Sequence, residues 1–201
     1  MNPKLIVRLL SFLVVISLWE FFGRRINPIL FTYPSAVAQA FVSLVASGEL
    51  QSYMTSSLLV LTYASILSIV VGVVFGVVMG RFSVVEWAAD IYISALYSTP
   101  MVAVVPLIVL WFGFKIPAKV VIVFSFMVFP VLLNTFEGVK NVDRNLQEVA
   151  RSFCSSESQL WRHLIIPSAI PFIVAGVRLA IGRGLVGMIV AEFYTSVTGL
   201  G

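Results

Sequence analysis

Charged side chains in the last apolar stretch of the chain are the first candidates for chemistry. Arg178, Arg183 and Glu192 lie within or beside this stretch, where an arginine at the centre of a bilayer costs about 2.5–3.5 kcal/mol. Such a group needs water, a partner or an anion. Arg178 is close enough to the start of the stretch to reach the membrane surface. For Arg183, which lies deeper, two interpretations stay open: it pairs with Glu192, or it gives a cationic lining to a solute path.

The surroundings of Arg183 bear on both interpretations. Glu192 follows nine residues later, a turn or more too far for a direct pair within one helix. A guanidinium in a path would suit an anionic solute such as a sulfonate. Gly182 and Gly184 leave room on either side of Arg183, and each weakens the helix by about 1 kcal/mol relative to Ala.

Polar and proline residues in other apolar stretches could line the same path. Pro100 and Pro106 each remove a backbone donor and free a carbonyl group, which a membrane tolerates where the carbonyl faces protein or a water-filled cavity. Ordinary helix kinks are the alternative. The predicted path residues are Ser98, Thr99, Pro100, Pro106, Asn134 and Arg183.

The sequence offers no catalytic or metal-binding constellation. His163 is the single histidine and Cys154 the single cysteine, which excludes a metal-binding His pair, a disulfide within the chain and a cysteine metal site. No phosphate-binding loop of the Walker A type occurs. We therefore predict a non-catalytic chain without a cofactor.

Composition indicates which elements must hold these residues. With 60% hydrophobic and 11% charged residues and a mean hydropathy of +1.04, the chain is typical of an integral membrane protein. A span needs about 20 apolar residues, so the chain has room for about five. Basic residues are scattered rather than gathered in a run, which argues against nucleic acid. The predicted spans of this single domain, residues 1–201, are Leu5–Phe22, Leu58–Gly80, Ile91–Trp111, Val120–Thr135 and Pro167–Ala191.

Shorter signals refine this outline. The first span has the basic start of a signal peptide but no cleavage site after it, so we predict that it is retained. A surface helix is predicted between the first two spans, capped by Ser35 and ended by Gly48. In the second span, a face of small residues favours helix packing over a dimer interface. That face consists of Gly72, Gly76 and Gly80.

The distribution of Lys and Arg predicts the orientation. With the N-terminus in the cytoplasm, seven basic residues lie inside and four outside, with Arg178 and Arg183 not counted. This bias places residues 143–167 in the cytoplasm. The inside residues are Lys4, Arg8, Arg81, Lys140, Arg144, Arg151 and Arg162, and the outside ones are Arg24, Arg25, Lys115 and Lys119.

Residues 143–167 form a polar segment in an otherwise apolar chain. Asp143 is positioned to cap a helix with an apolar stripe. Ser156 and Gln159 have the spacing of a capping box that opens a second helix. Two short amphipathic helices outside the bilayer predict a surface for another protein. The stripe of the first helix consists of Leu146, Val149, Ala150 and Phe153.

The polar segment resembles the loop signature of bacterial ABC importer permeases. That signature reads Glu-Ala-Ala, three residues, Gly, nine residues, Ile, one residue and Leu-Pro. Val149 replaces the first Ala, and Cys154 replaces the Gly. Because Cys lacks the freedom of Gly to adopt a positive φ, the turn is expected at Ser155 or Ser156 instead. The matching positions are Glu148, Ala150, Leu164, Ile166 and Pro167, with Leu164 and Ile166 as aliphatic replacements.

The resemblance extends from about Tyr33 to Gly201. The stretches TPMVAVVPLIVLWFGF, FPVLLNTFEGVKNVD, GVRLAIG and AEFYTSVTGLG are similar to the branch that imports taurine, sulfonates, nitrate or thiamine-precursor pyrimidines. It implies an all-α type I ABC importer transmembrane domain with about five spans and a cytoplasmic coupling loop over about residues 137–167. Related permeases continue beyond the equivalent of Gly201, so C-terminal spans are expected to be missing.

The resemblance also implies partners and a location. It implies cytoplasmic ABC ATPase subunits that hydrolyse ATP, a solute-binding protein outside, and a second permease copy in a homodimer. The location is a bacterial cytoplasmic (inner) membrane, with lipid around the spans and no nucleic acid as partner. Contact with the ATPase is expected at Glu148, Ala150, Arg151, Cys154, Ser155, Ser156 and Pro167.

Other functional classes stay open on the sequence alone. One is a small ion-coupled carrier or channel without an ATPase. Such carriers place ionisable groups in the middle of the membrane, whereas the acidic residues here lie near span ends or in loops. Another is a membrane scaffold, which would lack substrate-stimulated ATP hydrolysis.

Overall fold

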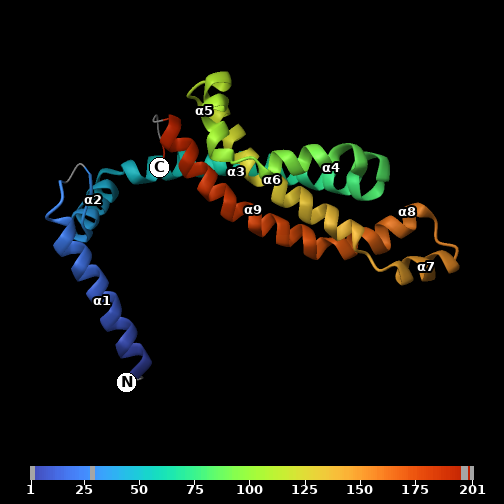
Figure 1. Ribbon diagram of the computed structural model, residues 1–201, viewed down its shortest axis with the longest axis horizontal. Helices are drawn as coiled ribbons and strands as arrows, with labels where there is room; N and C mark the ends of the chain where they lie inside the picture. The colour runs from blue at the N-terminus through green and yellow to red at the C-terminus, as the bar shows by residue number, and fades with distance from the viewer. Residues whose placement is uncertain (1–2, 28–29, 196–198, 200–201) are drawn as a thin grey trace. The chain divides into compact units, whose positions relative to one another are not determined.

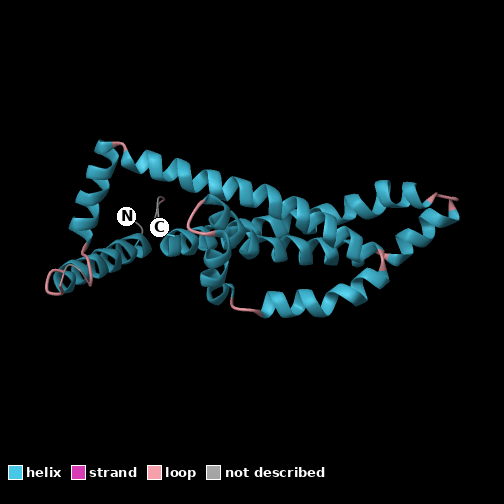
Figure 2. Cartoon of the chain, turned by 90° about the horizontal axis from the view of Figure 1, so that it is seen from above, coloured by secondary structure: helices cyan, strands magenta, loops and turns pink. Residues whose placement is uncertain are grey.

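The computed structural model describes residues 3–27, 30–195 and 199, and every regular element in these ranges is a helix (Figure 1, Figure 2). The chain divides into two compact units, Met1–Ser52 and Tyr53–Gly201. Among the described residues, four helices are long and apolar enough to cross a membrane, or up to five if one bent pair forms a single span. This confirms the predicted all-α membrane fold. In order, the helices are α1 Pro3–Gly23, α2 Pro34–Ser47, α3 Glu49–Arg81, α4 Ser83–Ser98, α5 Met101–Phe112, α6 Ile116–Lys140, α7 Arg144–Ser152, α8 Glu157–Leu160, the π-helical turn η1 Trp161–Ile165, and α9 Ile166–Thr195.

In the first unit, a polar contact joins α1 to α2. Most of the large apolar side chains of α1 are exposed, as expected of a span that faces lipid. The Glu20 carboxylate accepts hydrogen bonds from the Ser35 backbone N–H at 3.0 Å and from the Ser35 hydroxyl at 2.7 Å. Glu20 rather than Ser35 therefore caps α2, because a carboxylate is favoured at a helix N-terminus. Gly48 ends α2 with φ 76°, as predicted.

The span predicted over Ile91–Trp111 is not one helix. α4 and α5 meet with a bend of 96°. Pro100 restricts the residue before it to extended conformations, and Thr99 accordingly has φ −71° and ψ 130°. Pro106, by contrast, stays inside α5. Pro100 thus interrupts the span as predicted, but it reorients the chain instead of kinking a continuous helix.

Glycines allow α3 to approach α6 closely. A Cβ on Gly76 would lie 2.7 Å from both the Leu132 carbonyl oxygen and the Thr135 Cβ, so glycine is required for this approach. Gly72 and Gly80 approach α6 as tightly, one turn before and one turn after. Their neighbours follow in the same order along α6, so the two helices run parallel. The predicted packing face is confirmed, within one chain.

Glycines also bring α9 against α6, beside which it runs in Figure 1. A Cβ on Gly176 would lie 2.8 Å from the Asn134 Cβ, and one on Gly184 would lie 2.5 Å from the Met127 Sδ. Positions rise along α9 as they fall along α6, so these helices are antiparallel. The buried core around them includes Val60, Val105, Ile122, Val123, Met127, Val131, Ala180 and Met188.

The helix that contains the last predicted span begins before Pro167. α8, η1 and α9 form one continuous helical segment, Glu157–Thr195. Pro167 cannot donate a backbone hydrogen bond, and its ring crowds the carbonyl group of His163. The wider π turn directly before Pro167 provides the space. Pro167 therefore lies inside a helix, and the predicted apolar span Pro167–Ala191 is part of this longer segment.

Candidate functional site

Side-chain caps begin both helices of the polar segment. The Asp143 carboxylate accepts from the Asn145 backbone N–H at 2.8 Å and opens α7. The Ser156 hydroxyl accepts from the Gln159 backbone N–H at 3.3 Å, and the Gln159 side chain accepts from the Ser156 N–H at 2.8 Å. This reciprocal pair is the predicted capping box. Both predicted helix starts are confirmed.

Cys154 itself makes the turn after α7. Its φ is 58°, the one positive value for a residue other than glycine in the described ranges. The Cys154 N–H donates to the Arg151 carbonyl at 2.9 Å, and the Ser155 N–H donates to the Ala150 carbonyl at 3.2 Å. This Schellman arrangement places its left-handed residue at position 154. The prediction that Ser155 or Ser156 takes up the turn is therefore wrong. A side chain in this conformation costs about 1–2 kcal/mol.

α7 leaves its apolar stripe uncovered. Leu146, Val149 and Phe153 are 51%, 53% and 81% exposed, and α7 has no buried residue. An amphipathic helix with an exposed apolar face is typical of an element that docks on another protein. Of the predicted coupling residues, Glu148, Arg151, Cys154, Ser156 and Pro167 are exposed, and Ala150 and Ser155 are half-buried.

A hollow of about 280 Å³ lies between the α4–α5 break, α6 and α9. The Arg183 guanidinium donates to the Tyr97 hydroxyl at 2.9 Å and lies 5.1 Å from the centre of the Tyr97 ring. Tyr97 contacts Phe129 in turn, with ring centres 6.0 Å apart. The break before α5 therefore brings an aromatic hydroxyl to the guanidinium. The hollow is lined by Tyr97, Thr99, Met101, Ser125, Phe126, Phe129, Arg183 and Val186.

This hollow contains two of the six predicted path residues, Thr99 and Arg183. Asn134 is turned to its own helix, where it donates to the Pro130 carbonyl at 2.8 Å. The structure does not bring the remaining three to the hollow, although all are exposed: Ser98, Pro100 and Pro106. The sequence analysis did not predict Tyr97 as a path residue. A polar hydroxyl close to Pro100 in the sequence was the signal that could have indicated it.

Arg183 and Glu192 do not pair with each other. Arg183 is exposed, whereas Glu192 is 3% exposed and accepts a hydrogen bond from the Ser57 hydroxyl of α3. The open interpretation of a pair between them is therefore wrong. Lys119, which the orientation count places outside, is 2% exposed; its side of the membrane stays a prediction.

The two glycines beside Arg183 have different roles. A Cβ on Gly182 would meet no atom within 4 Å, so Gly182 does leave room as predicted. Gly184 instead faces Met127 of α6, where a Cβ would be too close. Room beside the guanidinium is thus found on one side only, and Gly184 serves helix packing.

A family model matches residues 68–201 of this chain, two thirds of its length. The family is described as "Binding-protein-dependent transport system inner membrane component". The chain belongs to this family. It is an ABC transporter permease with several membrane-spanning helices, as the sequence resemblance indicated.

Individual relatives agree with the family. The chain is 32% identical over 190 residues to the "Putative aliphatic sulfonates transport permease protein SsuC" of Bacillus subtilis, covering 94% of this chain and 69% of the relative. The protein of the same name in Escherichia coli is 36% identical over 174 residues, with 84% and 64% covered. The formylaminopyrimidine transport permease protein ThiX of Halalkalibacterium halodurans is 30% identical, with 96% and 77% covered. The chain thus spans about two thirds to three quarters of the length of these relatives.

A solved structure shares the fold. An amino acid ABC transporter crystallised with histidines superposes with a TM-score of 0.63 at 24% identity, over 77% of this chain and 76% of the other. This likeness supports the arrangement of helices and carries no information on the solute.

Proposed function

We propose that this chain is the membrane-spanning permease subunit of an ATP-driven importer for a small anionic solute. In this proposal, α7 and α8 contact a separate ATPase in the cytoplasm, and the hollow at Arg183 is part of the solute path. The observation that carries it is the exposed apolar stripe of α7, which this chain leaves uncovered. Family membership identifies the class of system in which a partner would cover the stripe.

A movement of the ATPase would be transmitted to the hollow at Arg183 along the helical segment Glu157–Thr195. The Arg151 guanidinium of α7 donates to the Glu157 carboxylate of α8 at 3.4 Å, so the two helices are tied together. Glu157–Thr195 is continuous, and Arg183 follows Glu157 at a helical distance of about 39 Å. A shift of α8 would therefore move Arg183 without an intervening loop, whereas a shift of α7 would reach α8 through residues 153–156 and the exposed Arg151–Glu157 ion pair.

The lining of the hollow supports an anion with an apolar body. The Arg183 guanidinium and the Tyr97 hydroxyl can donate to the oxygen atoms of a sulfonate or carboxylate. The Thr99 and Ser125 hydroxyls donate instead to the Ala95 and Val121 carbonyl groups of their own helices. Phe126 and three further apolar residues of the lining suit an aliphatic portion. Two of the relatives are named for aliphatic sulfonates and another for taurine, which is consistent with this solute class.

The remaining parts of the assembly follow from the same proposal. The Lys and Arg bias puts the N-terminus and the polar segment in the cytoplasm, and a solute-binding protein would deliver the solute from outside. A second copy of this permease would complete the path as a homodimer, since one protomer of this size is a thin wall for a solute.

Reversing the charge of Glu148 tests the coupling contact. Glu148→Arg changes an exposed α7 residue and no span, so we expect normal membrane insertion. Capture of the ATPase in pull-down assays and solute uptake should both fall at least about tenfold, because a like-charge contact in an interface costs several kcal/mol. Glu49→Arg, which alters an exposed glutamate at the start of α3, is the control and should retain both. Normal capture and uptake for Glu148→Arg would show that α7 is not the ATPase contact.

A further inference from the structure

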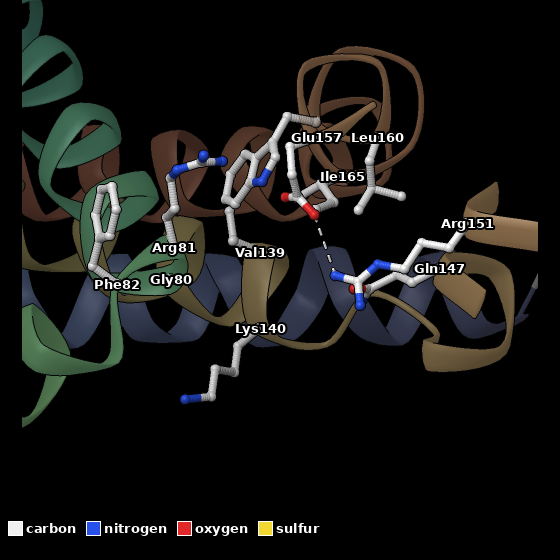
Figure 3. Close-up of a pocket in the computed structure, with 11 residues that line it drawn as sticks. Gly80, Arg81, Phe82, Val139, Lys140, Gln147, Arg151, Glu157, Leu160 and Ile165 are labelled. Atoms are coloured by element: carbon white, nitrogen blue, oxygen red, sulfur yellow. Dashed lines mark hydrogen bonds and ion pairs between the residues drawn. The ribbon is translucent and has the colours of Figure 1, made fainter. Parts of the chain in front are cut away.

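A second hollow, of about 340 Å³, lies where the C-terminal ends of α3 and α6 meet α7 and α8 (Figure 3). Three cations and one carboxylate line it, namely Arg81, Lys140, Arg151 and Glu157. Val139 and Ile165 add apolar surface. A cavity with this excess of positive charge is suited to an anion.

The charges around this hollow are unequally neutralised. Lys140 forms an ion pair with Glu86, and Arg151 forms one with Glu157. Arg81 has no ion pair among the described residues, and its guanidinium lies 4.7 Å from the Trp161 ring centre. Contact with an aromatic face leaves the N–H donors at the guanidinium edge available to a ligand.

We propose that this hollow binds the phosphate group of an anionic phospholipid. A third hollow, of about 460 Å³, shares Arg81 and Trp161 and is completed by Ser158, Arg162 and Ile166. A polar hollow thus adjoins one with an apolar edge, which matches a phosphate group that continues into glycerol and acyl chains.

The location supports a membrane lipid as the source of the phosphate. Arg81 lies in the last turn of α3, a predicted span. Phe82, the next residue, is 50% exposed, and Trp residues favour the membrane interface. Basic pockets between the ends of membrane helices bind anionic headgroups. A bound phospholipid would join the end of α3 to the α8–α9 segment. The inference needs neither the ATPase contact nor a particular solute, so it can fail independently of the proposed function.

Native mass spectrometry of the full chain in detergent tests the site. Phosphatidylglycerol, phosphatidylcholine and inorganic phosphate are the probes, and retained lipid is the readout. We expect retention of phosphatidylglycerol over phosphatidylcholine. Arg81→Gln should lower phosphatidylglycerol affinity about fivefold, the equivalent of one basic residue at an anionic surface. Arg8→Gln, which removes an exposed arginine of α1, is the matched control and should bind as the unaltered chain does.

Quenching of Trp161 fluorescence provides a readout that needs no change at Arg81. Phosphatidylglycerol with brominated acyl chains should quench more fluorescence than brominated phosphatidylcholine does, and Trp161→Phe should abolish the difference. Equal binding of both lipids, or equal losses in Arg81→Gln and Arg8→Gln, would overturn the proposal. Competition by inorganic phosphate as effective as that by phosphatidylglycerol would also overturn it, in favour of a soluble anion.

Discussion

The core formed by α3, α6 and α9 differs from the polar segment, residues 143–167, in how its apolar surface is covered. Between α3, α6 and α9, glycines allow contacts so close that an added Cβ would lie 2.5–2.9 Å from the facing helix. In the polar segment, α7 has no buried residue, and Phe153 is 81% exposed. The core therefore finds its packing partners within the chain, whereas α7 presents its apolar face to the outside.

This difference explains where backbone strain is tolerated. In the core, close helix contacts use residues without side chains, because interiors at this packing density accommodate no extra atoms. In the polar segment, Cys154 occupies a left-handed position that glycine would occupy without cost. The segment meets open space there, so the strain is confined to the backbone of one residue.

The largest expected effect is a loss of stability when a core glycine is replaced. Gly76→Val should destabilise the protein by about 3 kcal/mol, because the added side chain meets the Leu132 backbone oxygen, which cannot rotate away. Gly182→Val is the control, since a Cβ there meets nothing within 4 Å and Val has a higher helix propensity than Gly. Thermal unfolding in detergent measures both. Equal melting temperatures would show that glycine contacts do not limit core stability.

The next effect concerns α9, whose glycines pack against the core while Arg183 faces the hollow. Arg183→Leu should lower uptake of a sulfonate about tenfold or more, as expected for loss of a charge-assisted hydrogen bond. Arg183→Lys should lower it less. Arg178→Leu alters an exposed arginine of the same helix outside the hollow and should leave uptake intact. Unchanged uptake in Arg183→Leu would remove Arg183 from the path.

A smaller effect should strengthen the polar segment. Cys154→Gly should stabilise the turn by about 1 kcal/mol, because glycine adopts φ 58° without steric cost. Hydrogen exchange of the α7 amides should then slow about fivefold. Ser155→Gly is the control and should speed exchange, since Ser155 does not have a positive φ. Slower exchange in both variants would contradict the assignment of strain to position 154.

The last prediction concerns the side of the membrane on which the polar segment lies, and it needs no change in stability. Cys154 is exposed and is the single cysteine, so it reports the side of the membrane on which the polar segment lies. A membrane-impermeant thiol reagent should label it in inside-out vesicles and not in intact cells, with Cys154→Ser giving the background. The reverse pattern would invert the proposed orientation.

Local signals were the part that sequence reasoning recovered. The Asp143 cap, the capping box at Ser156 and the end of α2 at Gly48 all depend on residues at most three positions apart. The family resemblance likewise depended on residue types at set spacings in the polar segment. Such features need no knowledge of which helices touch.

Predictions were wrong where a side chain bonds to a residue far away in the sequence. Glu20 rather than Ser35 caps α2, although the two are fifteen positions apart. The Arg183 guanidinium bonds to Tyr97, 86 positions away, and not to Glu192. In each case a contact across the structure provides the partner that local spacing cannot reveal.

By itself, the sequence determined that this is an all-helical membrane permease, because apolar length, glycine spacing and helix caps act within single segments. Tertiary structure alone decided that Tyr97, near the end of α4, meets Arg183 of α9, and that Ser57 rather than Arg183 bonds to Glu192. The physical reason is that the 96° bend and the helix registers set these distances. The registers depend on close contacts among α3, α6 and α9, which no single segment contains, whereas the bend follows the local restriction before Pro100.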